Sequence, residues 1–186
     1  GGVLFEEGNQ NPNRIQFRLE PNGAARNFEV ATGDKFTGPI VGVVGYSYQN
    51  FKIYVSLNEM QAAHTKGTAS PEKTTIVKAE DKLTIASYNL ENFSNNKSST
   101  SDDKARKLAR AIANDMQSPD IVGVTEVQDN NGESAGDSKA NQSYERLITA
   151  IKAAGGVEYE YVNIDPVNNA DGGAPNANIR VGFLYN

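Results

Sequence analysis

The sequence predicts a small β-rich module followed by an α/β domain. Residues 1–60 contain short apolar runs broken by glycine, whereas residues 82–186 alternate apolar runs with amphipathic helical stripes. Between them, residues 61–81 are polar and include the sequence TKGTASPEK, which has the composition of a linker. We therefore expect a β module at 1–60, a linker at 61–81 and an α/β domain at 82–186.

Two apolar segments predict the β module. Residues 51–56 (FKIYVS) alternate, so Phe51, Ile53 and Val55 share one face of a strand. Residues 40–46 (IVGVVGY) are apolar but interrupted by glycine, which is typical of a tightly curved strand. Together they predict a small sheet or a partly closed barrel.

In the second part, helix signals stand between strand signals. Ser101 suits a helix N-cap, and Asp102 and Asp103 follow in the first turn, where the helix dipole favours acids. A second amphipathic stripe ends at the pair Gly155-Gly156, which suits a helix C-terminus. The expected strands are 83–88, 121–125, 159–164 and 179–185, and the apolar stripes of the two helices span 105–116 and 144–151.

Composition limits the functional classes. The absence of cysteine excludes disulfides, thiolate metal sites and a cysteine nucleophile. With 18 basic and 23 acidic residues, the net charge of −5 argues against nucleic-acid binding by a broad basic surface. An enzyme that meets phosphate through a bound metal ion remains compatible with that charge. No apolar run approaches the ~20 residues that cross a bilayer, and no signal peptide stands at the start. Both ends are expected to be cut from a longer protein, because residues 1–5 (GGVLF) resemble a domain interior.

Two polar residues directly follow predicted strands. Asn89 follows residues 83–88, and Glu126 follows residues 121–125. If these strands are neighbours, the two side chains meet at one rim of the sheet. A carboxylate and an amide oxygen suit a hard cation such as Mg²⁺. On the residues alone, the alternative that Asn89 caps a turn and Glu126 is merely solvated stays open.

Both segments resemble sequence motifs of one enzyme superfamily. Residues 85–93 (IASYNLENF) and 119–129 (PDIVGVTEVQD) resemble the first and second motifs of the endonuclease/exonuclease/phosphatase (DNase I-like) superfamily. The similarity continues through residues 144–156, 164–166, 171–173 and 178–185 (NIRVGFLY), a pattern similar to bacterial secreted or cell-surface nucleases. In that branch an OB-like module precedes the nuclease domain, and residues 32–38 and 44–47 resemble it.

The resemblance implies the first part of a DNase I-like sandwich, an α/β four-layer fold of two facing sheets with helices outside, preceded by a small all-β OB-like module. It implies an extracellular, metal-dependent nuclease that hydrolyses DNA, with RNA as an alternative substrate, and Mg²⁺, Ca²⁺ or Mn²⁺ as cofactor. Glu126 and Asn89 carry over as metal- and phosphate-site residues. The family's catalytic histidines belong to later sequence, so the chain alone is expected to be inactive. The remaining half of the domain is an expected partner, in the same chain or a second one. Candidates for the face toward its sheet are Ile85, Val122, Val124, Val181, Phe183 and Tyr185.

Other residues carry weaker functional signals. Gln128 and Arg180 are candidate substrate contacts, the latter as a bidentate phosphate donor or as a structural ion pair. His64, the single histidine, falls in the expected linker and is given no catalytic role. Residues 129–142 superficially resemble a calcium loop, but Ala140 occupies the twelfth position, where an EF-hand has a bidentate glutamate.

Two other functions are compatible with the sequence. A phosphomonoesterase or phospholipid phosphodiesterase could use the same scaffold, since a fold does not fix a substrate. Alternatively, the β module could bind single-stranded nucleic acid, with aromatic side chains as stacking platforms. The candidates for stacking are Tyr46, Tyr48, Phe51 and Tyr54.

Overall fold

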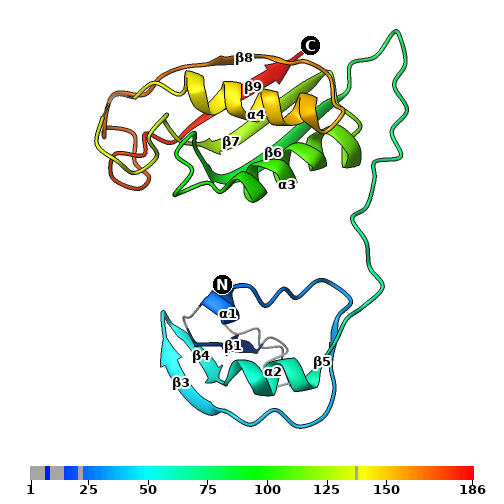
Figure 1. The fold of residues 1–186 in the computed structure, drawn as a ribbon, viewed down its shortest axis with the longest axis vertical. Coiled ribbons are helices and arrows are strands. Elements are labelled where there is room, and N and C mark those ends of the chain that lie inside the picture. Colours follow the sequence, from blue (N-terminus) through cyan, green and yellow to red (C-terminus); the bar gives the residue numbers. More distant parts are fainter. Residues whose placement is uncertain (1–6, 9–14, 21–22, 137) are drawn as a thin grey trace. The chain divides into compact units, whose positions relative to one another are not determined.

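The computed structural model describes residues 7–8, 15–20, 23–136 and 138–186. The chain forms two compact units, Gly1–Ser70 and Pro71–Asn186. Helices and strands occur in both units (Figure 1), which confirms the predicted mixed α/β class. None of the described helices is long and apolar enough to cross a membrane.

The described residues of the first unit form two small sheets. One has the order β1-β4-β3, with β1 parallel and β3 antiparallel to β4, and the other pairs β2 with β5. Its elements are β1 (Gln16–Arg18), α1 (Gly23–Arg26), β2 (Lys35–Phe36), β3 (Val43–Ser47), β4 (Asn50–Tyr54), α2 (Leu57–Ala63) and β5 (His64–Thr65). Among the described strands none closes a barrel, because the two sheets share no hydrogen-bonded edge. The unit is also not all-β.

Helix α2 and strand β5 lie where the sequence predicts the end of the module and a linker. Ser56 caps α2 by accepting a hydrogen bond from the amide of Glu59, and Met60 and Ala63 are buried. The Ser-x-x-Glu spacing of residues 56–59 is a capping-box signal for the start of this helix. The far end of the expected linker belongs to the second unit, where the Thr74 amide donates to the carbonyl of Asp115 at 2.8 Å.

The second unit is built on one four-stranded sheet with the order β6-β7-β9-β8. Strands β6 and β7 are parallel, and β9 pairs antiparallel with both β7 and β8. The elements are β6 (Ile85–Phe93), α3 (Asp102–Arg110), the π-helical turn η1 (Ala111–Asp115), β7 (Ile121–Val127), α4 (Asn141–Ala153), β8 (Glu160–Asn163) and β9 (Arg180–Tyr185). A helical crossover therefore joins two parallel strands, as the alternation of patterns predicts.

The predicted helix ends are observed in α3 and α4. Ser101 caps α3 by accepting from the Lys104 amide at 3.1 Å. After α4, Gly155 adopts a φ of 88° and donates to the carbonyl of Lys152, while the Gly156 amide donates to the carbonyl of Ile151. These two bonds form a Schellman motif, which requires the left-handed backbone that glycine adopts readily.

Helices α3 and α4 cover one face of the sheet (Figure 1). The core lies between these helices and the sheet. Val122, Val124 and Leu184 of the sheet are fully buried there, together with Ile112 and Leu147 of the helical layer. Because residues alternate along a strand, neighbouring positions point to the opposite face.

The opposite face of the sheet is apolar and bare. Ile85 is 70% exposed, and Val181, Phe183 and Tyr185 are also exposed. The register aligns these positions: Ile85 pairs with Ile121, which pairs with Tyr185. The six residues expected on one inner face are therefore divided, since Val122 and Val124 point toward the helices and the other four toward the bare face. In strands with apolar residues on both sides, composition does not distinguish the faces.

Candidate functional site

The carboxyl ends of β6 and β7 meet at one rim of the second unit's sheet. The strands are parallel, and Asn89 is the register partner of Thr125. Both strands are irregular here: the β6–β7 register shifts between Asn89 and Phe93, and the β7–β9 register shifts between Val124 and Val127. Such bulges bend a strand and redirect the side chains beside them.

The irregularity brings Glu126 to Asn89. Strict alternation would place Glu126 on the helix-covered face with Val124, but its φ of 57° breaks the alternation. The Nδ2 of Asn89 donates a hydrogen bond to Oε1 of Glu126 at 2.8 Å. The structure thus joins the two residues that the sequence motifs single out, and both remain accessible to solvent.

Asn89 is itself held in place by the backbone. Its Oδ1 accepts a hydrogen bond from the amide of Glu91 at 2.7 Å, and Glu91 and Asn92 have φ values of 53° and 57°. With one side-chain atom bound to the chain and the other to Glu126, Asn89 orients the carboxylate. Left-handed backbone at non-glycine residues is strained and clusters at functional sites.

A lysine completes the rim. Lys104, in the first turn of α3, donates to the carbonyl of Glu91, and its Nζ lies 3.4 Å from the Glu91 carboxylate. The sequence gives no signal for this contact, because it depends on how α3 packs beside the bulge of β6. It pairs the lysine ammonium with Glu91, two residues after Asn89.

The rim offers one oxygen for a metal ion. Oε1 of Glu126 accepts from Asn89, whereas Oε2 has no hydrogen-bond partner among the described residues. Magnesium sites commonly use one or two carboxylates together with waters and substrate phosphates. Within the described part of the chain, no group of three acidic or histidine side chains comes together. The donor set fits an open, largely hydrated divalent site and does not fit a closed protein cage.

Gln128 does not point to the rim. Its side chain is 1% exposed, and its Oε1 is buried without a hydrogen-bond partner. Its backbone amide donates to the carbonyl of Phe93 at 2.8 Å, which continues the β6–β7 contact. In this conformation Gln128 cannot reach a substrate in solution.

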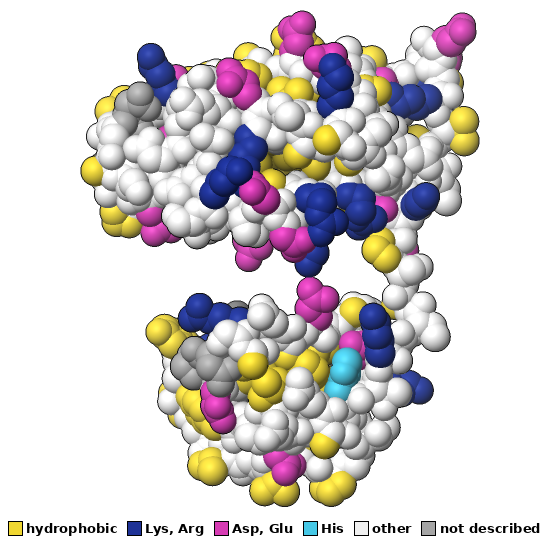
Figure 2. All heavy atoms as spheres, viewed as in Figure 1, with side chains coloured by type: hydrophobic (Ala, Val, Ile, Leu, Met, Phe, Trp, Pro, Cys, Tyr) yellow, Lys and Arg dark blue, Asp and Glu magenta, His cyan; other side chains and the backbone are white. Residues whose placement is uncertain are grey.

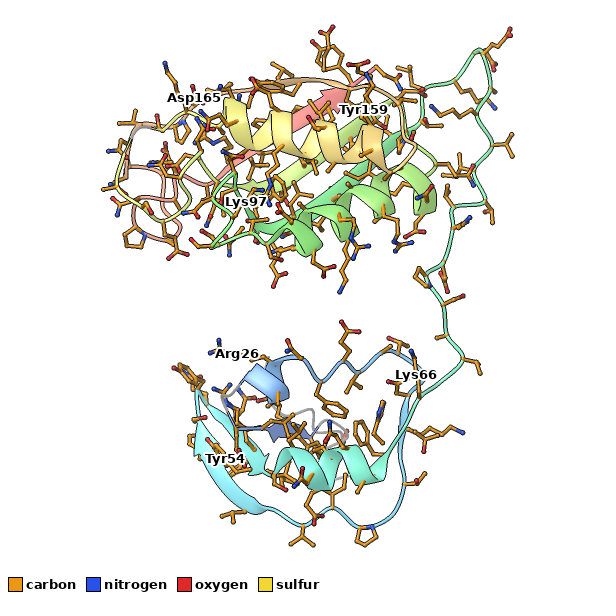
Figure 3. The ribbon with its side chains drawn as sticks, viewed as in Figure 1. Arg26, Tyr54, Lys66, Lys97, Tyr159 and Asp165 are labelled. Carbon is orange, nitrogen blue, oxygen red and sulfur yellow. The ribbon has the colours of Figure 1, made fainter. Side chains whose placement is uncertain are left out.

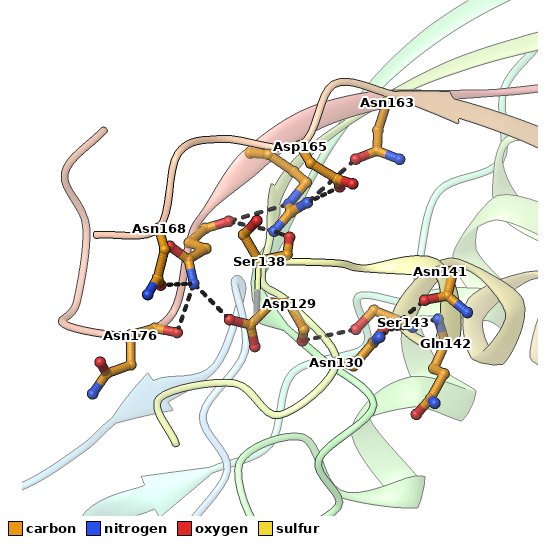
Figure 4. Close-up of polar contacts among 12 residues, drawn as sticks. Asp129, Asn130, Ser138, Asn141, Gln142, Ser143, Asn163, Asp165, Asn168 and Asn176 are labelled. Atoms are coloured by element: carbon orange, nitrogen blue, oxygen red, sulfur yellow. Dashed lines mark hydrogen bonds and ion pairs between the residues drawn. The ribbon is translucent and has the colours of Figure 1, made fainter. Parts of the chain in front are cut away.

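Arg180 is occupied by protein partners, of which Asp165 and Ser138 are labelled in Figure 4. Its side chain is 3% exposed, its Nη1 pairs with the Asp165 carboxylate at 2.5 Å, and its other nitrogens donate to the carbonyls of Asn178 and Ser138. Of the two readings left open by the sequence, this geometry corresponds to the structural ion pair. Arg180 joins the loop between β7 and α4 to the loop between β8 and β9.

Asp129 is the buried centre of the neighbouring loop network (Figure 4). Its carboxylate accepts hydrogen bonds from Nδ2 of Asn178 at 2.8 Å and from the amide of Asn131 at 3.0 Å. Burial raises the pKa of Asp129, and the Asn178 hydrogen bond opposes the rise. Both carboxylate oxygens therefore hold the loop network together.

His64 lies in the first unit and outside the rim. Its Nε2 is 2.7 Å from Oδ2 of Asp34, and its ring contacts Phe28 and Phe36. Asp34 also accepts from the amides of Ala31 and Gly67. The histidine therefore fastens β5 to the Asp34 turn, a structural role for a residue that the sequence places in a linker.

Comparisons with known proteins identify one domain and no function. Residues 1–66 match the family model described as "Domain of unknown function (DUF8508)". No curated protein and no solved structure matches the chain. The matched segment includes α2 and β5 of the first unit, and the Asn89–Glu126 rim lies outside it.

Proposed function

We propose that the second unit is part of a DNase I-like, metal-dependent phosphodiesterase that hydrolyses DNA, with RNA as a second substrate. One observation carries the proposal: bulged strand ends bring Asn89 and Glu126, from two separate motifs, into hydrogen-bond contact at 2.8 Å. Strained backbone at exposed polar residues is costly and is retained mainly where function requires it.

Glu126 would hold the ion through its free carboxylate oxygen, and Asn89 would fix the direction of that carboxylate. A bound Mg²⁺, or Ca²⁺ or Mn²⁺ in its place, supplies positive charge that stabilises a phosphoryl oxygen and the leaving 3′ oxygen. The Lys104 ammonium is paired with the carboxylate of Glu91, two residues after Asn89. Residues 82–186 contain no histidine, so the base that activates water is proposed to lie outside this chain.

The bare sheet face supports the finer fold proposal. In a DNase I-like sandwich a second sheet would cover Ile85, Val181, Phe183 and Tyr185, all of which are exposed. We propose that the remaining half of the domain supplies that sheet, in the same chain or as a second polypeptide. An extracellular or cell-surface location and an OB-like relation of the first unit rest on sequence resemblance alone.

The test is plasmid nicking with Mg²⁺ by a longer form of the protein that continues beyond residue 186. Glu126→Gln keeps the size of the side chain but removes its charge, and should lower the rate by ~10²-fold or more. Glu91→Gln is the matched control, because Glu91 is a nearby carboxylate whose side chain is 83% exposed. Full activity of Glu126→Gln at saturating Mg²⁺, or an equal loss in both variants, would reject the assigned role.

Substrate class is decided with the same preparation. A phosphodiesterase should hydrolyse bis(p-nitrophenyl) phosphate and DNA, whereas a phosphomonoesterase would prefer p-nitrophenyl phosphate, and a phospholipid enzyme would require vesicles. Preference for the monoester would identify a phosphomonoesterase on the same scaffold, and a requirement for vesicles would identify a phospholipid enzyme, so either result would reject the nuclease assignment.

A further inference from the structure

The two faces of the β1-β4-β3 sheet carry different side chains. The register aligns Arg18 with Tyr54 and Tyr54 with Val43, while Gly45 lies opposite Lys52. Alternation then divides the aromatic residues between the faces. Arg18, Lys52 and Tyr54 share one face, and Phe17, Tyr46, Phe51 and Ile53 share the other.

The turn of the β3–β4 hairpin is strained. Its two central residues, Tyr48 and Gln49, have φ values of 47° and 59°. Two-residue hairpin turns of this kind favour Asn-Gly or Asp-Gly, because side chains such as tyrosine are disfavoured in left-handed backbone. The side-chain Nδ2 of Asn50 braces the turn by donating to the Tyr48 carbonyl at 2.7 Å. Tyr48 lies at this turn and is 90% exposed.

Beside this turn lies a groove of about 840 Å³. The Nζ of Lys52 is 5.1 Å from the centre of the Tyr48 ring and donates to Oγ of Ser47 at 2.9 Å. That hydroxyl lies 3.3 Å from the hydroxyl of Tyr54. The ring of Tyr54, on β4 (Figure 3), packs over Gly45, where a Cβ would lie 2.5 Å from Cε2 of the ring. Glycine therefore allows the ring to lie close to the sheet.

The groove combines aromatic rings with positive charge. Arg18 and Lys52 line it, against the single carboxylate of Glu20. Hydrophobic side chains also reach the surface of this unit elsewhere (Figure 2). On the opposite face of the sheet, the ring centres of Tyr46 and Phe51 lie 5.0 Å apart. Among the described residues, no cation lies over either of these two rings. Bases stack on exposed rings and phosphates pair with cations, so the groove suits both parts of a nucleotide.

We propose that this groove binds single-stranded nucleic acid, with bases stacking on Tyr48 and Tyr54 and the backbone meeting Lys52 and Arg18. The proposal narrows the stacking residues to two of the four aromatic candidates. It does not depend on hydrolysis by the second unit. It also accounts for the strained turn, since an asparagine at position 48 would suit the backbone better but would lack the ring.

The test is fluorescence anisotropy of a labelled oligo(dT) of about ten nucleotides, a typical length for such sites. It uses the whole chain at low salt with EDTA, which removes divalent metal ions from the second unit. Tyr48→Asn should weaken binding by roughly tenfold or more while raising the melting temperature, because asparagine tolerates left-handed backbone. Lys52→Gln should also weaken binding. Tyr46→Thr, on the opposite face, is the matched control and should bind as the wild type does.

Four results would overturn the proposal. They are no binding by the wild type, unchanged binding by Tyr48→Asn, an equal loss in Tyr46→Thr, and equal displacement of the oligonucleotide by a duplex competitor, whose bases are not free to stack. Glu126→Gln separates the two proposals, because it should bind oligo(dT) normally even though it removes the proposed metal ligand.

Discussion

Asn89 and Glu126 show how the backbone around a residue determines what its side chain can do. Asn89 has one atom bound to the Glu91 amide and the other to Glu126, so its amide is fixed. In other proteins, removing a group that orients a metal ligand lowers metal affinity or activity by roughly tenfold to a hundredfold. In the proposed function, Asn89 is therefore a positioning residue and Glu126 is the metal ligand.

Asn89→Ala should therefore raise the Mg²⁺ concentration needed for half-maximal nicking by roughly tenfold or more in an active, longer form of the protein. The melting temperature should change little, because Asn89 is exposed. Activity as a function of Mg²⁺ concentration measures the effect. An unchanged metal requirement would mean that Asn89 does not orient the ligand.

Asp34, in the first unit, has a carboxylate that three hydrogen bonds hold in place. Hydrogen bonds from the amides of Ala31 and Gly67 and from His64 lower the pKa of Asp34 to about 2, from an ordinary value of 3.8. Because the folded pKa lies below the unfolded one, the carboxylate stabilises the unit above pH 4 and loses that contribution as the pH falls from about 4 to about 2.

The Gly67 amide reports this titration directly, because it donates to Oδ1 of Asp34 at 2.7 Å. Its NMR chemical shift should titrate with a midpoint near pH 2, and the melting temperature of the unit should fall over the same range. In Asp34→Asn the titration should disappear and the unit should be less stable at neutral pH. A midpoint near 4 would show that the three hydrogen bonds do not persist in solution.

At the residue scale, the sequence predicts the site only in part. The motifs single out Asn89 and Glu126, but alternation places Glu126 on the wrong face, because a left-handed residue inside a strand leaves no local signal. The burial of Gln128 and the ion pair of Arg180 depend on loops that are distant in sequence. His64 illustrates the same point, since its partner Asp34 is thirty residues away.

The positions of helices and strands can be predicted from the sequence more fully than the directions of their side chains. The strand patterns at 83–88 and 121–125 identify β6 and β7, although both strands continue through the bulges to Phe93 and Val127. Ser101 and the Gly155-Gly156 pair predict helix ends from local chemistry, which is independent of tertiary contacts. The apolar pattern does not predict helix α2, because its seven residues are too few for a clear apolar period.

The two glycines that follow α4 are required for different reasons, Gly155 for its backbone conformation and Gly156 for packing space. A Cβ at Gly155 would meet nothing within 4 Å, but its φ is 88°. A Cβ at Gly156 would lie 2.7 Å from Cγ2 of Ile151 and 2.9 Å from Cβ of Ala113. We expect Gly155→Ala to cost about 1 kcal/mol in the free energy of unfolding, and Gly155→Asn to cost less.

Gly156→Ala and Gly156→Asn should both be destabilising, by about 1–3 kcal/mol for alanine, because the obstacle there is packing. Urea unfolding of the four variants measures the difference. If asparagine were no better than alanine at position 155, the left-handed backbone would not be the cause of the cost there.

The whole second unit has one covered and one bare sheet face. Leaving apolar surface in water forfeits on the order of 25 cal/mol for each Å² that could be buried. We predict that the 186-residue chain binds a hydrophobic dye such as ANS or self-associates through this face. Val162 of β8 is the register partner of Phe183 and is also exposed on this face. Replacing Val162, Val181 and Phe183 together with threonine should reduce dye binding and association while leaving the unit folded.

Val122→Thr is the matched control on the covered face, where burial of a hydroxyl without an assured partner should destabilise the unit. Dye fluorescence, sedimentation and thermal melting distinguish the two faces. Unchanged dye binding in the triple variant would mean that the bare face does not drive association and needs no covering sheet.

The central claim is that Glu126, oriented by Asn89, holds a divalent metal ion at the rim of β6 and β7. The most direct measurement is a titration of the chain with Mn²⁺, whose unpaired electrons broaden nearby NMR signals. The claim predicts that amide signals of residues 89–92 and 124–127 broaden first and that Glu126→Gln abolishes this broadening, whereas Glu91→Gln does not. Broadening that begins elsewhere, or that persists unchanged in Glu126→Gln, would contradict it.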